Sequence, residues 1–92
     1  MTLLSDEQIA TGLEGRDWRR ESNVLVRDWR FADFAAAIAF VERVAEVAET
    51  SNHHPDILVH GWNKVRLTLS THSEGGITAA DLALAERLDA VS

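Results

Sequence analysis

The residues of this chain that are best suited to chemistry are its histidines. His53 and His54 are adjacent and precede Pro55, His60 follows closely, and His72 lies further along the chain. An imidazole with an unperturbed pKa of about 6.5 both donates and accepts a proton near neutral pH. The cluster therefore predicts acid–base catalysis, although the spacing by itself fits ordinary surface or loop histidines equally well.

Two other chemistries are open to the same region. Glu49 and the histidines other than His60 could bind zinc or iron, but the sequence has no HExxH motif and no cysteine to complete a ligand set. Ser70 or Ser73 beside His72 could act as a nucleophile, but a Gly-x-Ser-x-Gly elbow is absent, as are the glycine-rich loops that bind nucleotides. We therefore expect no metal and no bound cofactor, which leaves acid–base work by histidine.

A carboxylate accompanies the histidine pair. Glu49 precedes His53 at the i, i+4 spacing that brings side chains together on a helix, so it could orient or charge an imidazole. Considered alone, it would be a solvated neighbour of Glu42 and Glu46. His53 and His54 are expected just beyond a helix C-terminus, where the negative end of the dipole favours imidazolium.

The composition limits the class of protein. The chain has 92 residues, 46% hydrophobic and 26% charged, which fits one globular domain over residues 1–92. The formal net charge is −6 and the nine basic residues are scattered, which disfavours a nucleic-acid partner. No apolar run approaches the roughly 20 residues that span a bilayer. The N-terminus has no secretory pattern and cysteine is absent, so we expect no membrane segment and a cytoplasmic location.

The elements that must position the histidines follow from capping signals and periodicity. Ser5 and Gln8 have the spacing of a capping box, which predicts a helix over residues 6–13. Residues 17–21 and 24–30 are predicted strands joined by a Ser-Asn turn, which together form a hairpin.

A long helix is predicted next. It begins after Asp33, a plausible N-cap, and ends near Ser51, because the residue before a proline, here His54, is disfavoured in the α region. One face of this helix is predicted to be apolar and to pack: Phe34, Ala37, Ile38, Val41, Ala45 and Ala48. The segment that holds His53 and His54 is therefore a connection after the helix.

A second hairpin is predicted from residues 57–60 and 62–71, with its turn near Gly61. Apolar and polar residues alternate along the second strand, so one face packs and the other is polar. If strand geometry persists, the same parity places Trp62 and His72 on the polar face, away from the helices.

A last helix opens at Thr78 and Asp81, which have the spacing of another capping box. The order αββαββα predicts a two-layer α+β fold with a four-stranded antiparallel sheet and helices on one face. The other face is left open and carries Trp62, and a chain this short buries only about 60 to 65% of its unfolded surface. We therefore expect an oligomer with contacts along a sheet edge.

The order and spacing of these residues resemble the pterin-4a-carbinolamine dehydratase family. The matching pattern is Glu49-x-x-x-His53-His54-Pro55, followed by Trp62, His72 and Asp81. The resemblance covers nearly the whole chain and implies a cofactor-free enzyme that dehydrates 4a-hydroxytetrahydropterin to quinonoid dihydropterin. It also implies the α+β fold, a homodimer or homotetramer, and functional coupling to an aromatic amino-acid hydroxylase that produces the substrate.

The resemblance also implies the site residues. His53, His54 and His72 match the active-site histidines, with His53 or His54 as acid toward the leaving hydroxyl and His72 as base or binding group. The positions implied for substrate binding are Glu49, Asn52, Ser70, Thr71, Trp18 and Asp81. Asn52 stands where some members of the family have an acid. His60 lies outside the pattern and is expected to be an exposed strand residue.

An alternative function is compatible with the same resemblance. Some relatives act as dimerisation partners of a transcription factor or assist the assembly of a carboxysomal enzyme, so a non-catalytic binding, assembly or coactivator module is the second hypothesis. Such a module does not need three histidines together with Glu49, and this chain has all four. The resemblance therefore favours catalysis.

Overall fold

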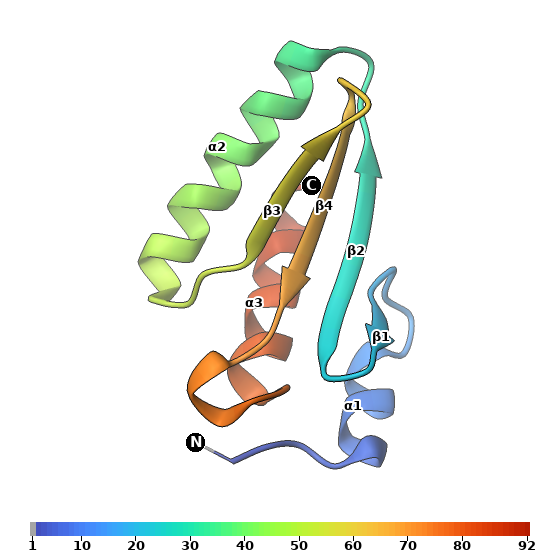
Figure 1. Ribbon diagram of the computed structural model, residues 1–92, viewed down its shortest axis with the longest axis vertical. Helices are drawn as coiled ribbons and strands as arrows, with labels where there is room; N and C mark the ends of the chain where they lie inside the picture. Colours follow the sequence, from blue (N-terminus) through green and yellow to red (C-terminus); the bar gives the residue numbers. More distant parts are fainter. Residues whose placement is uncertain (1) are drawn as a thin grey trace.

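The computed structural model describes residues 2–92 (Figure 1). In chain order the elements are α1 (Asp6–Leu13), β1 (Arg19–Glu21), β2 (Val24–Arg30), α2 (Phe34–Ser51), β3 (Asp56–His60), β4 (Lys64–Leu69), the short 3₁₀ helix η1 (His72–Glu74) and α3 (Ala79–Ala90). The αββαββα order is confirmed, with η1 as an addition. Both capping boxes, at the start of α1 and of α3, form as the sequence predicts.

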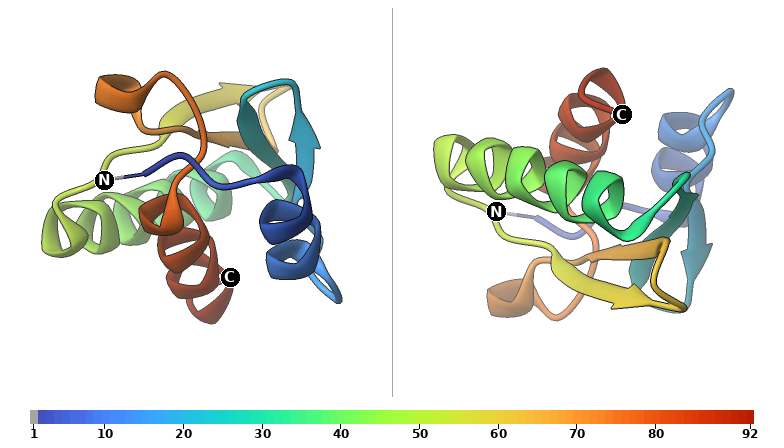
Figure 2. Two further views of the ribbon diagram at one scale, coloured as in Figure 1. Left: turned by 90° about the horizontal axis from the view of Figure 1, so that it is seen from below. Right: turned by 90° about the horizontal axis from the view of Figure 1, so that it is seen from above.

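The four strands form one antiparallel sheet in the order β1-β2-β4-β3. Figure 2 shows the three α-helices on the same side of this sheet, so the predicted two-layer α+β architecture is confirmed. β3 lies at one edge of the sheet and pairs with β4, with Asp56 opposite Thr68. This register brings the start of β3 beside the end of β4.

The core lies between the sheet and the helices. The alternation predicted for β4 is confirmed, because Val65, Leu67 and Leu69 are all sealed from solvent. Their partners across the layer include Phe40 of α2 and Leu84 of α3. These contacts pack α2 and α3 against the central strand β4.

The buried face predicted for α2 is wrong in part. Phe34 is 55% exposed and Ala45 is also exposed, whereas Phe40 and Val44 are fully buried. Phe40 lies 4.8 Å from the ring of Trp29, measured between centroids, in an aromatic cluster on the core face. Apolar residues extend around much of this helix, so periodicity alone could not select the stripe that meets the sheet.

Two predicted strands are longer than the observed ones. β1 begins at Arg19 because the chain turns before it and directs Trp18 into the core. β4 covers only Lys64–Leu69: Trp62 lies in the preceding turn with a positive φ of 58°, and His72 begins η1. The strand parity therefore does not extend to Trp62 or His72.

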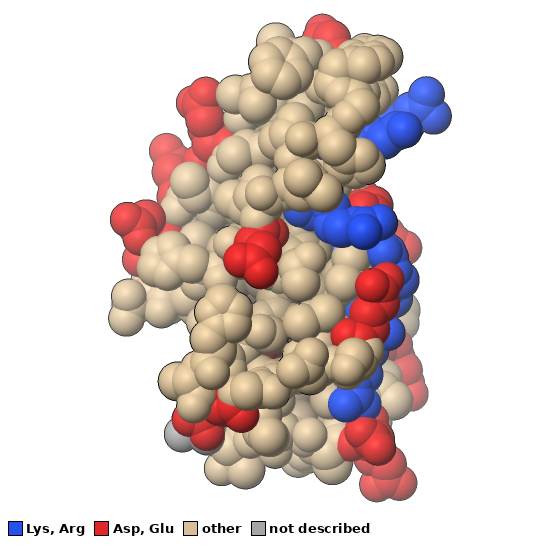
Figure 3. All heavy atoms as spheres, in the orientation of Figure 1, with Lys and Arg blue, Asp and Glu red and all other residues tan. Residues whose placement is uncertain are grey.

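The face of the sheet opposite the helices carries interleaved charges. Asp28 lies between Arg19 and Arg66 and forms an ion pair with each. Figure 3, in the orientation of Figure 1, shows basic and acidic side chains alternating along the β1–β2 edge, while acidic side chains follow α2. Among the helices described, none has the length and apolar content needed to cross a membrane.

Candidate active site

The connection after α2 positions the histidine pair. Asn52 caps the helix in the left-handed conformation, with φ of 50°, and its N–H and that of His53 bond to carbonyls of the last turn. Pro55 then directs the chain into the extended β3. His53 and His54 are thereby held just past the negative end of the α2 dipole, as predicted.

A second loop faces this connection. After β4 ends, the N–H of Thr71 donates to the carbonyl of Gly76 at 2.7 Å and closes a loop that contains η1. Gly75 completes the turn with φ of 72°, a region that glycine enters without strain. Because β3 and β4 are paired neighbours, this loop and the histidine connection lie at the same end of the sheet.

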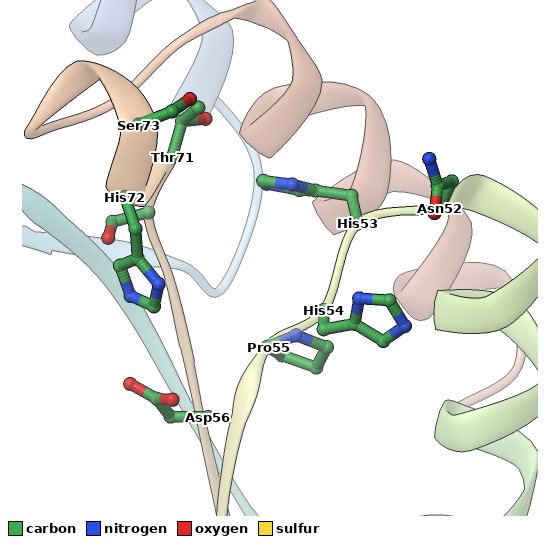
Figure 4. Close-up of a pocket in the computed structure, with 9 residues that line it drawn as sticks. Asn52, His53, His54, Pro55, Asp56, Thr71, His72 and Ser73 are labelled. Atoms are coloured by element: carbon green, nitrogen blue, oxygen red, sulfur yellow. The ribbon is translucent and has the colours of Figure 1, made fainter.

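Between the two loops lies a cavity of about 320 Å³. Its lining residues are Asn52, His53, His54, Pro55, Asp56, Ser70, Thr71, His72 and Ser73. In Figure 4, the His53 ring extends toward the loop that carries Thr71 and His72, whereas the His54 ring points away toward α2. The three matched histidines all line this cavity, which has a size that small organic ligands occupy, but only His53 and His72 direct their rings into the space between the two loops.

His53 is bound to a buried carboxylate. Its Nε2 lies 2.6 Å from Oδ1 of Asp81, whose side chain has no exposed surface, and the His53 side chain is 18% exposed. Oδ2 of Asp81 accepts hydrogen bonds from the Thr71 hydroxyl and from the Thr78 N–H, each at 2.9 Å. Asp81 therefore lies behind His53, with no contact to the cavity of its own.

His54 is bound to an exposed carboxylate. Its Nε2 also lies 2.6 Å from a carboxylate oxygen, that of Glu49, but the two side chains are 58% and 77% exposed. The sequence spacing pointed from Glu49 to His53, and the structure instead pairs Glu49 with the next histidine. The left-handed residue at the helix end turns the chain, which explains the change of partner.

The other predicted residues have different positions. Asn52, Ser70, Thr71 and His72 line the cavity, as described above, and His72 is exposed at the start of η1. Trp18 does not line it: this side chain is buried in the core, and its Nε1 donates to Asp89 at 2.8 Å.

Three residues at the site were not among the site residues that the resemblance implies. Asp56 and Ser73 line the cavity, and Thr78 donates its N–H to Asp81. Asp56 is adjacent to the His-His-Pro segment in sequence, which is the signal that could have identified it. Ser73 lies on η1, and nothing in the sequence pattern predicts that element.

The arrangement suits proton transfer. Two imidazoles that differ in exposure and a third on the opposite loop can act as acid, base and hydrogen-bonding groups toward one bound molecule. Across residues 2–92, no group of three or more His, Asp or Glu side chains converges in the way a metal site would require. His53 and His54 pair with carboxylates instead.

Comparisons with known proteins agree with one another. The model of the family described as pterin 4 alpha carbinolamine dehydratase matches residues 2–91. A Nocardia farcinica protein whose name includes "pterin-4-alpha-carbinolamine dehydratase" is 52% identical over 88 residues, which cover 95% of this chain and 92% of that protein.

Two solved structures are also similar. The crystal structure of a transcriptional coactivator/pterin dehydratase from Brucella melitensis superposes with a TM-score of 0.90 at 30% identity and covers 98% of both chains. A pterin dehydratase-like protein described as a RuBisCO assembly factor in the α-carboxysome superposes with a TM-score of 0.69 at 28% identity, covering 84% of this chain and 90% of the other.

Proposed function

Because the chain belongs to the pterin-4a-carbinolamine dehydratase family, we propose that it dehydrates 4a-hydroxytetrahydropterin to quinonoid dihydropterin by histidine acid–base catalysis. The observation that carries the proposal is that His53, His54 and His72 all line one cavity. Family membership supplies the class of substrate, and the cavity supplies the groups that the reaction needs.

The reaction needs two proton transfers. The hydroxyl on C4a departs as water after it receives a proton, the N5–H loses a proton, and a C4a=N5 double bond forms. Protons therefore balance, and no electron acceptor is needed. Positioned acid–base groups typically contribute about 10² to 10⁴ in rate, which suits this elimination.

We assign the roles by position. His53 or His54 donates the proton to the leaving hydroxyl, because both lie on the connection after α2 and line the cavity across from His72. His72, on the opposite loop, accepts the N5 proton or binds the ring. Polar groups of Asn52, Ser70 and Thr71 are the proposed hydrogen-bonding partners of the flat heterocycle. For Glu49, Asp81 and Trp18, the site contacts described above support at most an indirect role.

The test is turnover of freshly generated 4a-hydroxytetrahydropterin, followed by ultraviolet absorbance with and without chelator. The intact protein should accelerate dehydration in both conditions. His53→Ala, His54→Ala and His72→Ala should each lower kcat by about 10² or more. His60→Ala is the matched control, because His60 is an exposed strand histidine outside this cavity. A folded, intact protein that performs no better than buffer would overturn the proposal.

The alternative function is a binding or assembly module on the same fold. It is supported by the two similar structures, one of a protein described as a transcriptional coactivator/pterin dehydratase and one of a protein described as a RuBisCO assembly factor. A module of that kind would tolerate loss of all three histidines. The decisive variant has His53, His54 and His72 all replaced by Ala. If it behaved like the intact protein in every assay, including turnover, this second proposal would replace the first.

We also propose that the protein is a homodimer or homotetramer. Ile57 and Leu58 of the edge strand β3 are 39% and 52% exposed, and Trp62 beside it is 62% exposed. Apolar side chains along an unpaired edge favour pairing with a second copy. Sedimentation velocity should show a dimer or tetramer for the intact protein, and a monomer would contradict the proposal.

A further inference from the structure

Asp81 lies behind His53 and is sealed from solvent. We propose that Asp81 is a positioning residue, which keeps His53 protonated at Nε2 so that Nδ1 is the nitrogen that exchanges a proton with the substrate. The protonation of Nε2 is inferred from the contacts of His53 and Asp81, whatever the protein's activity. The claim about proton exchange rests on the proposed function.

The hydrogen bonds around Asp81 establish its role as an acceptor. The Thr78 N–H can only donate, and it bonds to Oδ2 at 2.9 Å. The Thr71 hydroxyl also donates to Oδ2. Because its hydrogen is used there, the Thr78 hydroxyl, 2.7 Å away, donates a hydrogen bond to the Thr71 oxygen. These donors occupy Oδ2 and leave Oδ1 to accept from Nε2 of His53, which then carries the proton of that hydrogen bond.

The second nitrogen of His53 is free for chemistry. Within residues 2–92, Nδ1 forms no hydrogen bond, and it is not among the unpartnered side-chain atoms that are sealed from solvent. It is therefore accessible, on a side chain that lines the cavity. A neutral imidazole protonated at Nε2 presents an acceptor at Nδ1, and an imidazolium presents a donor there.

The position of Asp81 is fixed by the fold. It is the N3 residue of the α3 capping box, and the same carboxylate therefore holds the helix start with one oxygen and His53 with the other. Thr71, which also donates to it, belongs to the loop after β4. Three segments thus meet at one carboxylate, so the orientation of the His53 ring depends on tertiary structure.

The direct test is the ¹⁵N NMR spectrum of the intact protein at a pH where His53 is neutral. Protonated and unprotonated ring nitrogens have well-separated shifts, and we expect Nε2 to be the protonated one. Asp81→Asn should reverse the tautomer, because the introduced amide can direct its NH₂ group at Nε2 while its oxygen still accepts from Thr78. A wild-type His53 that is protonated at Nδ1 would overturn the proposal, even if the variant did not fold.

Asp89→Asn is the matched control. Asp89 is also on α3 and also accepts several hydrogen bonds, but its partners are Arg16, Arg27 and Trp18. This variant should leave the His53 nitrogen shifts unchanged. If Asp81→Asn also left them unchanged, Asp81 would not set the tautomer and the proposal would fail.

Kinetics test the remaining step. Asp81→Asn should lower kcat by about 10² or more with KM within a few-fold, since in the Asp–His pair of serine proteases the same substitution costs about 10⁴ through the wrong tautomer. A raised KM with unchanged kcat would instead make Asp81 a determinant of substrate binding and would overturn the proposal. If the intact protein showed no turnover, the proposed function would fail while the NMR result still decided the tautomer.

Discussion

His53 and His54 are neighbours in the chain, and each has its Nε2 2.6 Å from a carboxylate oxygen. The two pairs differ in their surroundings: the His53–Asp81 pair is 18% and 0% exposed, whereas the His54–Glu49 pair is 58% and 77% exposed. Water and salt screen the exposed pair, while the buried carboxylate has no replacement for its protein partners. Equal distances therefore do not imply equal contributions to stability or to chemistry.

The comparison predicts the largest effect for Asp81→Ala. This change leaves the Thr71 hydroxyl and the Thr78 N–H without their buried acceptor, so the free energy of unfolding should fall by about 3 to 5 kcal/mol. Glu49→Ala should lower it by less than about 1 kcal/mol. Urea denaturation of both variants measures the difference. Similar losses of unfolding free energy at the two positions would show that burial does not distinguish the two pairs.

A smaller loss is expected for Thr71→Val, which removes one donor to Asp81 and preserves the shape of the side chain. The unfolding free energy should fall by about 1 to 2 kcal/mol, because Asp81 loses a buried hydrogen bond. Thr50→Val is the control: that hydroxyl bonds to a helix carbonyl on the exposed side of α2, so its loss should be almost neutral. Equal effects would show that burial does not matter here.

A still smaller effect is expected for Glu49→Gln, measured in kcat. The exposed pair contributes at most about 1 kcal/mol, so kcat should change by no more than about fivefold. The change should shrink further as salt shortens the Debye length from about 10 Å at 0.1 M to about 3 Å at 1 M. A large, salt-independent loss would place Glu49 in direct contact with the substrate.

The smallest effect is expected at an exposed ion pair outside the cavity that His53, His54 and His72 line. The hydrogen bond from Arg66, with a further one from Arg19, holds the pKa of Asp28 below its ordinary value of 3.8, although partial desolvation opposes this. A lowered folded-state pKa stabilises the fold above pH 3.8, and that contribution disappears as the pH falls through the folded value.

Asp28→Asn should therefore lower the unfolding free energy by less than about 1 kcal/mol at pH 7, because Asp28 is 39% exposed. Well below pH 3.8 the variant and the intact protein should be equally stable. Denaturation at the two pH values checks this. A difference that grew at low pH would contradict the sign of the pKa shift.

Much of the fold was predictable because its signals are local. Capping boxes act between residues three apart, and the alternation in β4 reflects a strand with one buried face, so both predictions are confirmed. The loop position of His53 and His54 follows from Pro55 in the same way. The buried stripe of α2 was not predictable, because it depends on which side of the helix meets the sheet and α3.

The sequence by itself determined the types of the chemical groups, their order along the chain and the loops that carry them. Only the tertiary structure decided which histidine received which carboxylate. Asp81 lies 28 residues from His53, and the two meet because the β3–β4 hairpin returns the chain to the end of α2, where α3 begins. Burial depends on packing between segments that are distant in sequence, so the difference between the two histidine pairs arises only when the chain folds.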